Sequence, residues 1–148
     1  MSGTGARMRG LRPVLLIIVL LAGGSRALAA ETPAPACHAG QQAKLMAELM
    51  FGRDIGRRIG VSEAAWRRFL EREVTPRFPD GLTVVKALGQ WRDRSTGRIV
   101  REPSELVMVV LPGHPDDQAR LEAIVAAYKR QFQQQSVGVI VQSACAAF

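Results

Sequence analysis

The chain has 148 residues, a formal net charge of +7, 47% hydrophobic residues, two cysteines and two histidines. Four of its arginines lie in the first 30 residues, so removal of a leader there lowers the net charge from +7 to +3. A charge this small argues against a nucleic-acid-binding protein, and the remaining length predicts a single domain with one core.

The first 30 residues have the order of a signal peptide. Three arginines precede an apolar run at 14–21, and small residues at 27 and 29 suit cleavage after Ala29 or Ala30. The run is far shorter than the roughly 20 residues that a membrane-spanning helix needs. We therefore predict a cleaved signal peptide at 1–30, no membrane attachment afterwards, and a periplasmic or secreted bacterial protein.

The lead-in segment at 31–43 contains Cys37, and the other cysteine, Cys145, lies near the end of the chain. An even pair of cysteines in an oxidising compartment predicts a disulfide. The alternatives are a metal site and a reactive thiol. A metal site lacks partners, because His38 and His114 are the only histidines and no C-x-x-C spacing occurs. A reactive thiol has only His38 nearby as a base.

Residues 44–148 form the predicted domain. The apolar run at 44–51 suits a strand or a helix equally well by its pattern. The segment 52–60 holds three glycines and three arginines, and we expect a loop.

A first helix is predicted from Ser62, an N-cap residue, to the Thr75-Pro76 pair, where proline stops it. Its buried stripe consists of Trp66, Phe69, Leu70 and Val74.

A hairpin follows the turn at 78–81. We expect one strand at 82–91, a loop at 92–98, and a return strand that begins at Ile99 and resumes at 106–111 after an interruption at Pro103.

A second helix is predicted after the turn at 112–115, with Asp116 and Asp117 at its N-terminus, and a short last strand at 137–141. The buried stripe of this helix consists of Leu121, Ile124, Val125, Tyr128 and Phe132.

If the run at 44–51 is a strand, the order is β-α-β-β-α-β. That order predicts an α+β, ferredoxin-like fold, an antiparallel sheet with two helices on one face. In this topology the last strand pairs with the first, which would place Cys37 beside Cys145. The disulfide and the fold therefore support each other.

The sequence lacks the motifs of known catalytic devices, which favours a protein that is not an enzyme and needs no cofactor or metal. Arg53, with Arg57 and Arg58, lies in a glycine-bearing loop before a helix, an arrangement that can bind anions. The simpler interpretation is a solvated loop. His114 and Asp116 allow an acid–base or metal pair, but a helix-capping turn explains them more simply.

A second candidate site lies across the hairpin, where Gln90, Trp91 and Arg92 are expected to face Arg101 and Glu102. Trp91 would form a wall, Gln90 would orient a ligand, and the arginines would hold its carboxylate or phosphate. The alternative is that these opposed charges only set the strand pairing.

Several segments resemble a family of small exported bacterial proteins known only as a domain of unknown function. They are FGR at 51–53, VTPRFPDGLTV at 74–84, GQWRD at 89–93 and REPS at 101–104. The resemblance covers about residues 45–148 and implies a signal peptide followed by one compact α+β domain. It implies no activity and no site residue.

The sequence thus favours an exported module that binds a small anionic ligand or an envelope protein, and that self-associates as a homodimer through an open face or edge of its sheet. The rival is a small exported enzyme acting on an anionic substrate, with Arg53, Arg92 and Arg101 as the clamp and Glu102 or Asp93 as the acid or base. A structural envelope factor that contacts only proteins is a third hypothesis.

Overall fold

The computed structural model describes residues 36–55 and 58–148, all within the compact unit Pro33–Phe148. The predicted signal peptide, the start of the lead-in segment and Arg57 lie outside the described residues. Within the described part, no helix is long and apolar enough to cross a membrane.

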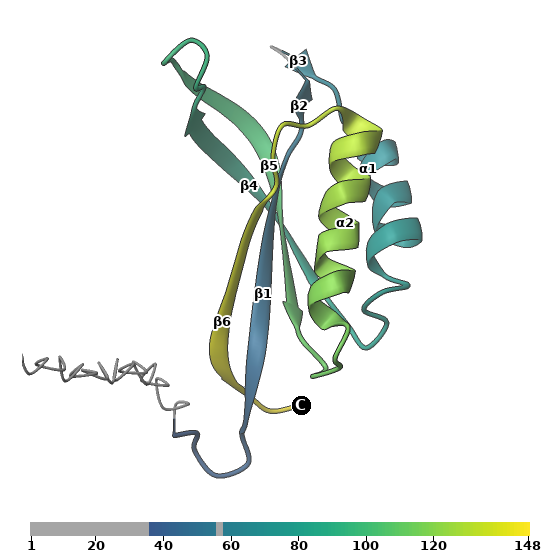
Figure 1. Ribbon diagram of the computed structural model, residues 1–148, viewed down its shortest axis with the longest axis vertical. Helices are drawn as coiled ribbons and strands as arrows, with labels where there is room; N and C mark the ends of the chain where they lie inside the picture. The colour runs from purple at the N-terminus through teal and green to yellow at the C-terminus, as the bar shows by residue number, and fades with distance from the viewer. Residues whose placement is uncertain (1–35, 56–57) are drawn as a thin grey trace, which may run out of the picture. The chain divides into compact units, whose positions relative to one another are not determined.

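The main sheet has four strands in the order β4-β5-β1-β6, and all neighbouring strands are antiparallel. The helical segments all lie on one face of this sheet (Figure 1). This arrangement confirms the predicted α+β, ferredoxin-like fold. The strands are β1 (Gln42–Gly52), β4 (Thr83–Arg92), β5 (Ile99–Val110) and β6 (Gly138–Ala146), and the helical segments are α1 (Glu63–Phe69), η1 (Leu70–Val74) and α2 (Asp117–Phe132).

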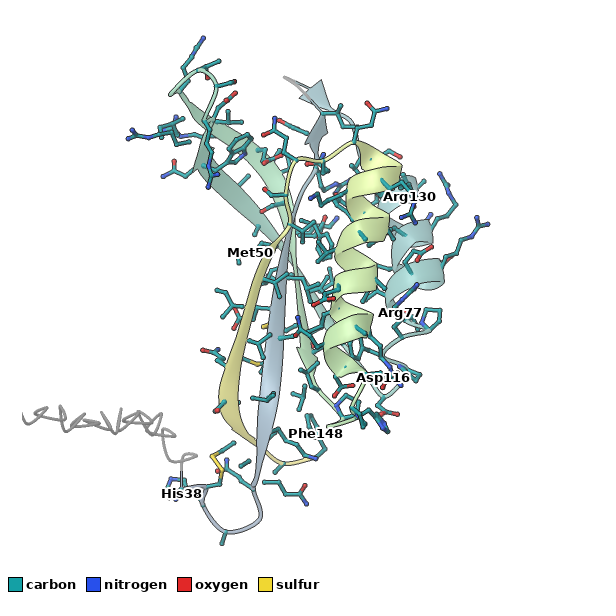
Figure 2. All side chains as sticks on the ribbon, viewed as in Figure 1. His38, Met50, Arg77, Asp116, Arg130 and Phe148 are labelled. Atoms are coloured by element: carbon teal, nitrogen blue, oxygen red, sulfur yellow. A yellow bond between two sulfur atoms is a disulfide. The ribbon has the colours of Figure 1, made fainter. Side chains whose placement is uncertain are left out.

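The ambiguous first run is strand β1. Its alternate residues Ala47, Leu49 and Phe51 are fully buried against the helices, whereas Met46, Glu48 and Met50 lie on the other face and are only partly covered. This alternation with a period of two is that of a strand with one buried face. The sheet therefore has a helix-covered face and an open face, on which Met50 lies (Figure 2).

The first helix begins and ends where its sequence predicts. The Ser62 hydroxyl accepts a hydrogen bond from the Ala65 N–H at 3.2 Å and caps the N-terminus. The last turn widens into the π-helix η1, in which the Thr75 N–H donates to the Leu70 carbonyl at 2.8 Å. Proline at position 76 then prevents continuation.

The core between sheet and helices is an aromatic cluster. The Phe51 ring lies 5.2 Å from Trp66, 5.9 Å from Phe69 and 4.7 Å from Tyr128 between centroids. Phe132 extends the cluster from the end of α2. The Tyr128 hydroxyl donates a 2.7 Å hydrogen bond to the Gly52 carbonyl, and burial raises the pKa of this tyrosine well above its ordinary value. The helices and β1 are thus joined at the point where β1 ends.

The expected loop at 52–60 contains regular structure. Two short strands, β2 (Asp54–Ile55) and β3 (Arg58–Ile59), pair as a small antiparallel hairpin. The Arg53 carbonyl accepts hydrogen bonds from both the Gly60 and Val61 N–H groups at 3.0 Å and closes the hairpin. Glycine and arginine content alone does not reveal such backbone pairing.

The predicted interruption at Pro103 is also wrong, since β5 runs without a break from Ile99 to Val110. The Pro103 carbonyl accepts a hydrogen bond from the Arg53 N–H, just past the end of β1. The nitrogen and the carbonyl of one strand residue point to the same side, so the Pro103 nitrogen also faces this position. Pairing with β1 stops at Ser104, opposite Gly52. Proline therefore lies just past the ladder and removes no hydrogen bond from it.

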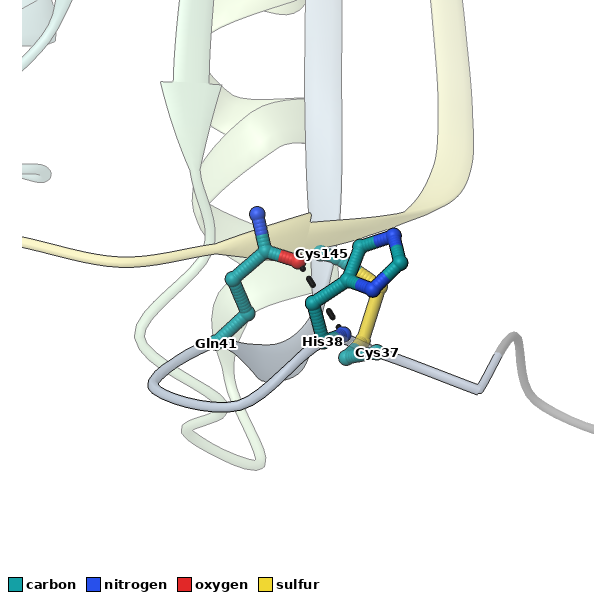
Figure 3. The surroundings of a disulfide bond; sticks show 4 residues. All are labelled: Cys37, His38, Gln41 and Cys145. Carbon is teal, nitrogen blue, oxygen red and sulfur yellow. Dashed lines mark hydrogen bonds between the residues drawn. A yellow bond between two sulfur atoms is a disulfide. The ribbon is translucent and has the colours of Figure 1, made fainter.

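The two cysteines form the predicted disulfide, with Cα atoms 5.5 Å apart (Figure 3). Cys145 lies in β6 opposite Ala43 of β1, so the bridge joins the start of the domain to its last strand. A hydrogen bond from the His38 N–H to the Gln41 side chain lies in the turn beside it.

Candidate functional site

A pocket of about 520 Å³ lies on the open face of the sheet. It is near the end of the sheet where β1 stops and where the loop at 93–98 joins β4 to β5. Its lining residues come from all four main strands, from β2 and from the segment 133–136 after α2. Its volume is within the range of about 300 to 1,000 Å³ that is usual for small-molecule sites.

Glycines on three strands hollow out this pocket. Gly89 of β4, Gly52 of β1 and Gly138 of β6 all line it. A methyl group on Gly52 would lie 2.6 Å from the Glu102 carboxylate, and one on Gly138 would lie 2.9 Å from the Met50 methyl group. An isolated glycine in a strand often marks such a close approach. Any larger residue at these positions would fill space that the pocket now leaves open.

Glu102 is held in the pocket by two hydrogen bonds. Its Oε1 accepts a 2.7 Å hydrogen bond from the Trp91 indole N–H, and its Oε2 accepts a 3.0 Å bond from the Asp54 backbone N–H. Glu102 lies opposite Gly89 in the pairing of β4 with β5, and Trp91, two residues further along β4, lies on the same face of the sheet. Residues of β4 and β2 therefore hold the Glu102 carboxylate of β5 beside the Trp91 ring.

The pocket lining is acidic. It includes Glu48, Asp54, Asp93 and Glu102 and contains no lysine or arginine. The Asp54 Oδ1 atom is buried and accepts no hydrogen bond from the described residues. The pocket is thus suited to a group that carries positive charge or N–H donors.

Asp93, which also lines the pocket, stabilises the loop between β4 and β5. Its Oδ1 accepts from the Ser95 N–H at 2.7 Å and from the Ser95 hydroxyl at 2.6 Å, which fixes the tip of the hairpin. These hydrogen bonds from Ser95 hold the pKa of Asp93 below its ordinary value of 3.8. Asp93 is therefore ionised at neutral pH.

Arg53 lies on the helix-covered side of the sheet and is only 9% exposed. Its Nε and Nη2 atoms donate to the Val61 carbonyl, and its Nη1 donates to Glu105 at 2.8 Å and to Glu63 at 3.1 Å. Two carboxylates and a carbonyl thus engage the guanidinium group. Of the other arginines in the anion-binding hypothesis, Arg58 lies in β3 and Arg57 lies outside the described residues.

The hairpin residues of the second hypothesis separate into two groups. Trp91 and Glu102 line the pocket together, and Gln90 contributes to its edge. Arg101 pairs with Gln90, one position away from the Gly89–Glu102 pair, so alternation directs it to the opposite face. Arg92 and Arg101 are both exposed and do not line the pocket.

Sequence reasoning missed Asp54, Met50 and the three glycines of the pocket. The sequence places Gly52 in an expected loop, and the strands that carry Gly89 and Gly138 are predicted from their apolar residues. A glycine within a strand pattern was the signal that could have indicated a hollow in the sheet.

The turn before α2 has a capping role. Asp117 Oδ2 accepts hydrogen bonds from the Gly113 and His114 N–H groups at 2.8 and 3.0 Å. Asp116 pairs with Arg120 at 2.9 Å, and this hydrogen bond lowers the pKa of Asp116 below 3.8. Among the residues that the structure describes, no three histidine, cysteine, aspartate or glutamate side chains gather to hold a metal ion.

The charge cluster at the start of α1 predicts a pH dependence. Hydrogen bonds from Arg53 and then Lys86 hold the pKa of Glu63 below its ordinary value of 4.5. Since the folded-state pKa is the lower one, the stabilisation is fully present above pH 4.5 and is lost as the pH falls through the folded-state value.

We therefore expect wild type to melt at a slightly higher temperature than Glu63→Gln near neutral pH, the effect being small because Glu63 is exposed. The two melting temperatures should converge in acid. Thermal unfolding followed by circular dichroism at a series of pH values measures this, and a difference that stays constant with pH would contradict it.

Comparison with solved structures shows the same fold in a phage enzyme and a weaker likeness to a second protein. A phage SAM lyase in complex with S-methyl-5'-thioadenosine is 16% identical over 79% of this chain and 97% of its own, with a TM-score of 0.57. The same kind of enzyme in its apo state is 18% identical over 72% of this chain and 90% of its own, with a TM-score of 0.53. CutA from Synechococcus elongatus, complexed with Bis-Tris, is 12% identical over 72% of this chain and 87% of its own, with a TM-score of 0.46.

No curated protein matches the sequence. The family model described as "Protein of unknown function (DUF3574)" matches residues 46–148, which is most of the chain and nearly all of the described domain. The chain belongs to this family of proteins of unknown function.

Proposed function

We propose that this protein is an exported module that binds a small organic cation, or an amine-bearing molecule, in the pocket on the open face of its sheet. The observation that carries the proposal is the pocket lining, in which Trp91 stands beside the fixed Glu102 carboxylate and no basic side chain is present. Aromatic rings and carboxylates together are the usual partners of organic cations. The disulfide and the sequence of the leader are compatible with export.

The charge of the ligand departs from the anionic ligand that the sequence favoured. Arg53 is engaged by Glu105, and Arg92 and Arg101 do not line the pocket. An anion in the pocket would therefore meet Glu102 and Asp54 without a neutralising partner, at a cost in electrostatic repulsion. A cation would be attracted by the same groups.

The phage SAM lyase with this fold was solved with S-methyl-5'-thioadenosine, and this guides the choice of probes. S-adenosylmethionine has a positively charged sulfonium group, whereas S-methyl-5'-thioadenosine is an uncharged thioether. The two also differ in the amino-acid part that only S-adenosylmethionine carries. Choline, a smaller cation without that part, therefore tests the effect of positive charge, and phosphate is the anionic probe.

We expect isothermal titration calorimetry to detect binding of at least one cationic probe and none of phosphate. Glu102→Gln should weaken that binding by about 1.5 to 3 kcal/mol, roughly 10- to 100-fold, because a charged partner is replaced by a neutral one. Gly52→Ala should also weaken it, since the added methyl group would lie 2.6 Å from the Glu102 carboxylate and push this end of the side chain out of its hydrogen-bonded position, while the fold is retained.

The matched control is Glu122→Gln on the exposed face of α2, which removes the same charge outside the pocket lining and should leave binding unchanged. Binding of phosphate in preference to the cations, or equal binding by wild type and Glu102→Gln, would contradict the proposal.

The second candidate is a small exported enzyme in which Glu102 acts as the acid or base. It is favoured by one observation, the orientation of that carboxylate by two N–H donors beside an open cavity. Mass spectrometry of a bound probe after incubation tests it. Product that forms with wild type and Asp93→Asn but not with Glu102→Gln would support catalysis, and an unchanged probe would leave binding alone as the function.

A further inference from the structure

We propose that the outer edge of β6 pairs antiparallel with the same edge of a second copy of this chain, so that two four-stranded sheets join into one of eight strands. This contact uses the outer edge of β6, whereas the ligand pocket lies on the open face and takes only Gly138 from that strand. Among residues 36–55 and 58–148, no strand lies beyond this edge, because β6 is the last strand in the order β4-β5-β1-β6. Such an edge is a template for another strand.

The composition of β6 is that of an unprotected edge. Its nine residues, GVIVQSACA, include no charged residue and no proline. Three β-branched residues follow one another and stay exposed, Val139 at 42%, Ile140 at 45% and Val141 at 42%. Because side chains alternate, Val139 and Val141 lie on the helix-covered side and Ile140 on the open side, so both faces of the edge are apolar.

The opposite edge of the sheet is protected. β4 carries Lys86, whose side chain is 73% exposed, and Arg92 at its end. Charged residues of this kind, lysine above all, prevent edge-to-edge pairing. The contrast between the two edges indicates that β6 alone is suited to pairing.

The occupant is a second copy because the edge is complementary to itself. Antiparallel pairing about a two-fold axis places the same uncharged strand on both sides, and all 18 residues from Gln131 to the end lack a charged side chain. With the axis at Ile140, Val139 of each copy lies opposite Val141 of the other, a favourable cross-strand pair. The disulfide at Cys145 ties β6 to the start of the domain and holds the edge in place.

The test is the mass of the oxidised, purified protein in solution, measured by light scattering and native mass spectrometry. We expect twice the mass of one chain for wild type and a loss to the single-chain mass for Ile140→Lys, which puts a charge at the axis. The matched control is Val85→Lys on the other edge strand, a β-branched residue of similar exposure, 43%, on the same open face. It should remain a dimer.

Hydrogen–deuterium exchange of wild type gives an independent readout that does not depend on a variant folding. Peptides covering 138–146 should exchange faster on dilution as the dimer separates, whereas the hairpin tip at 93–98 should not change. The proposal would be overturned by a monomeric wild type or by exchange of β6 that is independent of concentration. It would also be overturned if Val85→Lys lost the dimer as Ile140→Lys does, because the contact would then lie on the open face.

Discussion

Removing the disulfide by the double change Cys37→Ala/Cys145→Ala is expected to lower the free energy of unfolding by about 4 to 5 kcal/mol in the chain-entropy model. The bridge joins residues 108 positions apart and closes nearly the whole domain into one loop. Without it, the unfolded chain gains the conformational freedom of that loop, while the folded state loses few contacts. The same loss is expected when wild type is reduced.

Urea unfolding of oxidised wild type, reduced wild type and the double variant measures this effect. The single variants Cys37→Ala and Cys145→Ala are the controls, since each should be as unstable as the double variant if the bridge is the whole cause. A loss below about 1 kcal/mol would mean that the ends of the domain are held together by other contacts or that the unfolded chain stays compact.

Replacing Arg53 with methionine is expected to destabilise the domain by about 3 to 5 kcal/mol, which is the usual effect of removing one partner of a buried ion pair. Glu105 is only 1% exposed, and its Oε1 accepts a 2.8 Å hydrogen bond from Arg53. Its Oε2 is buried without a hydrogen-bond partner among the described residues. Loss of Arg53 therefore leaves a carboxylate in the interior with no countercharge, and it also leaves the Val61 carbonyl without its two donors.

Two further variants test whether the loss of stability comes from leaving a buried charge without its partner. Lys86→Met breaks the exposed contact with Glu63 at 3.3 Å and should cost at most about 1 kcal/mol. Arg53→Met/Glu105→Met removes both partners and should recover much of the loss, because no buried charge remains. Equal stability of Arg53→Met and Lys86→Met in urea unfolding would contradict the assignment of Arg53 to the core.

The elements of the fold were predictable because each follows from local periodicity or from a single capping residue. Ser62 marks the start of the first helix, and the spacing of Leu121, Ile124 and Tyr128 marks the buried face of the second. The predicted loop at 52–60, the break at Pro103 and the end of the last strand at 141 are wrong where backbone pairing decides the outcome. Pairing with β1 extends that last strand to Ala146. Pro103 is tolerated only because β1 has already ended beside it, and the hairpin after Gly52 is closed by hydrogen bonds to the Arg53 carbonyl.

The candidate site was predictable only in part. Trp91 and Glu102 belong to one hairpin, and their proximity follows from pairing between neighbouring strands. The partner of Arg53 is Glu105, 52 residues away, and no local pattern identifies a contact across strands at that distance. The same holds for glycines 52, 89 and 138, which line one pocket because the strand order brings β1, β4 and β6 into one sheet.

The bridge between Cys37 and Cys145 also determines what limited proteolysis of the domain would release. Because it links the two ends of the domain, the backbone from 37 to 145 is a covalent ring. One cut in the exposed hairpin tip at 93–98 would open that ring without releasing a fragment, and the two pieces would separate only after reduction. A nicked molecule would thus keep all of its strands attached, with the pocket residues on both sides of the cut still held by one chain of bonds.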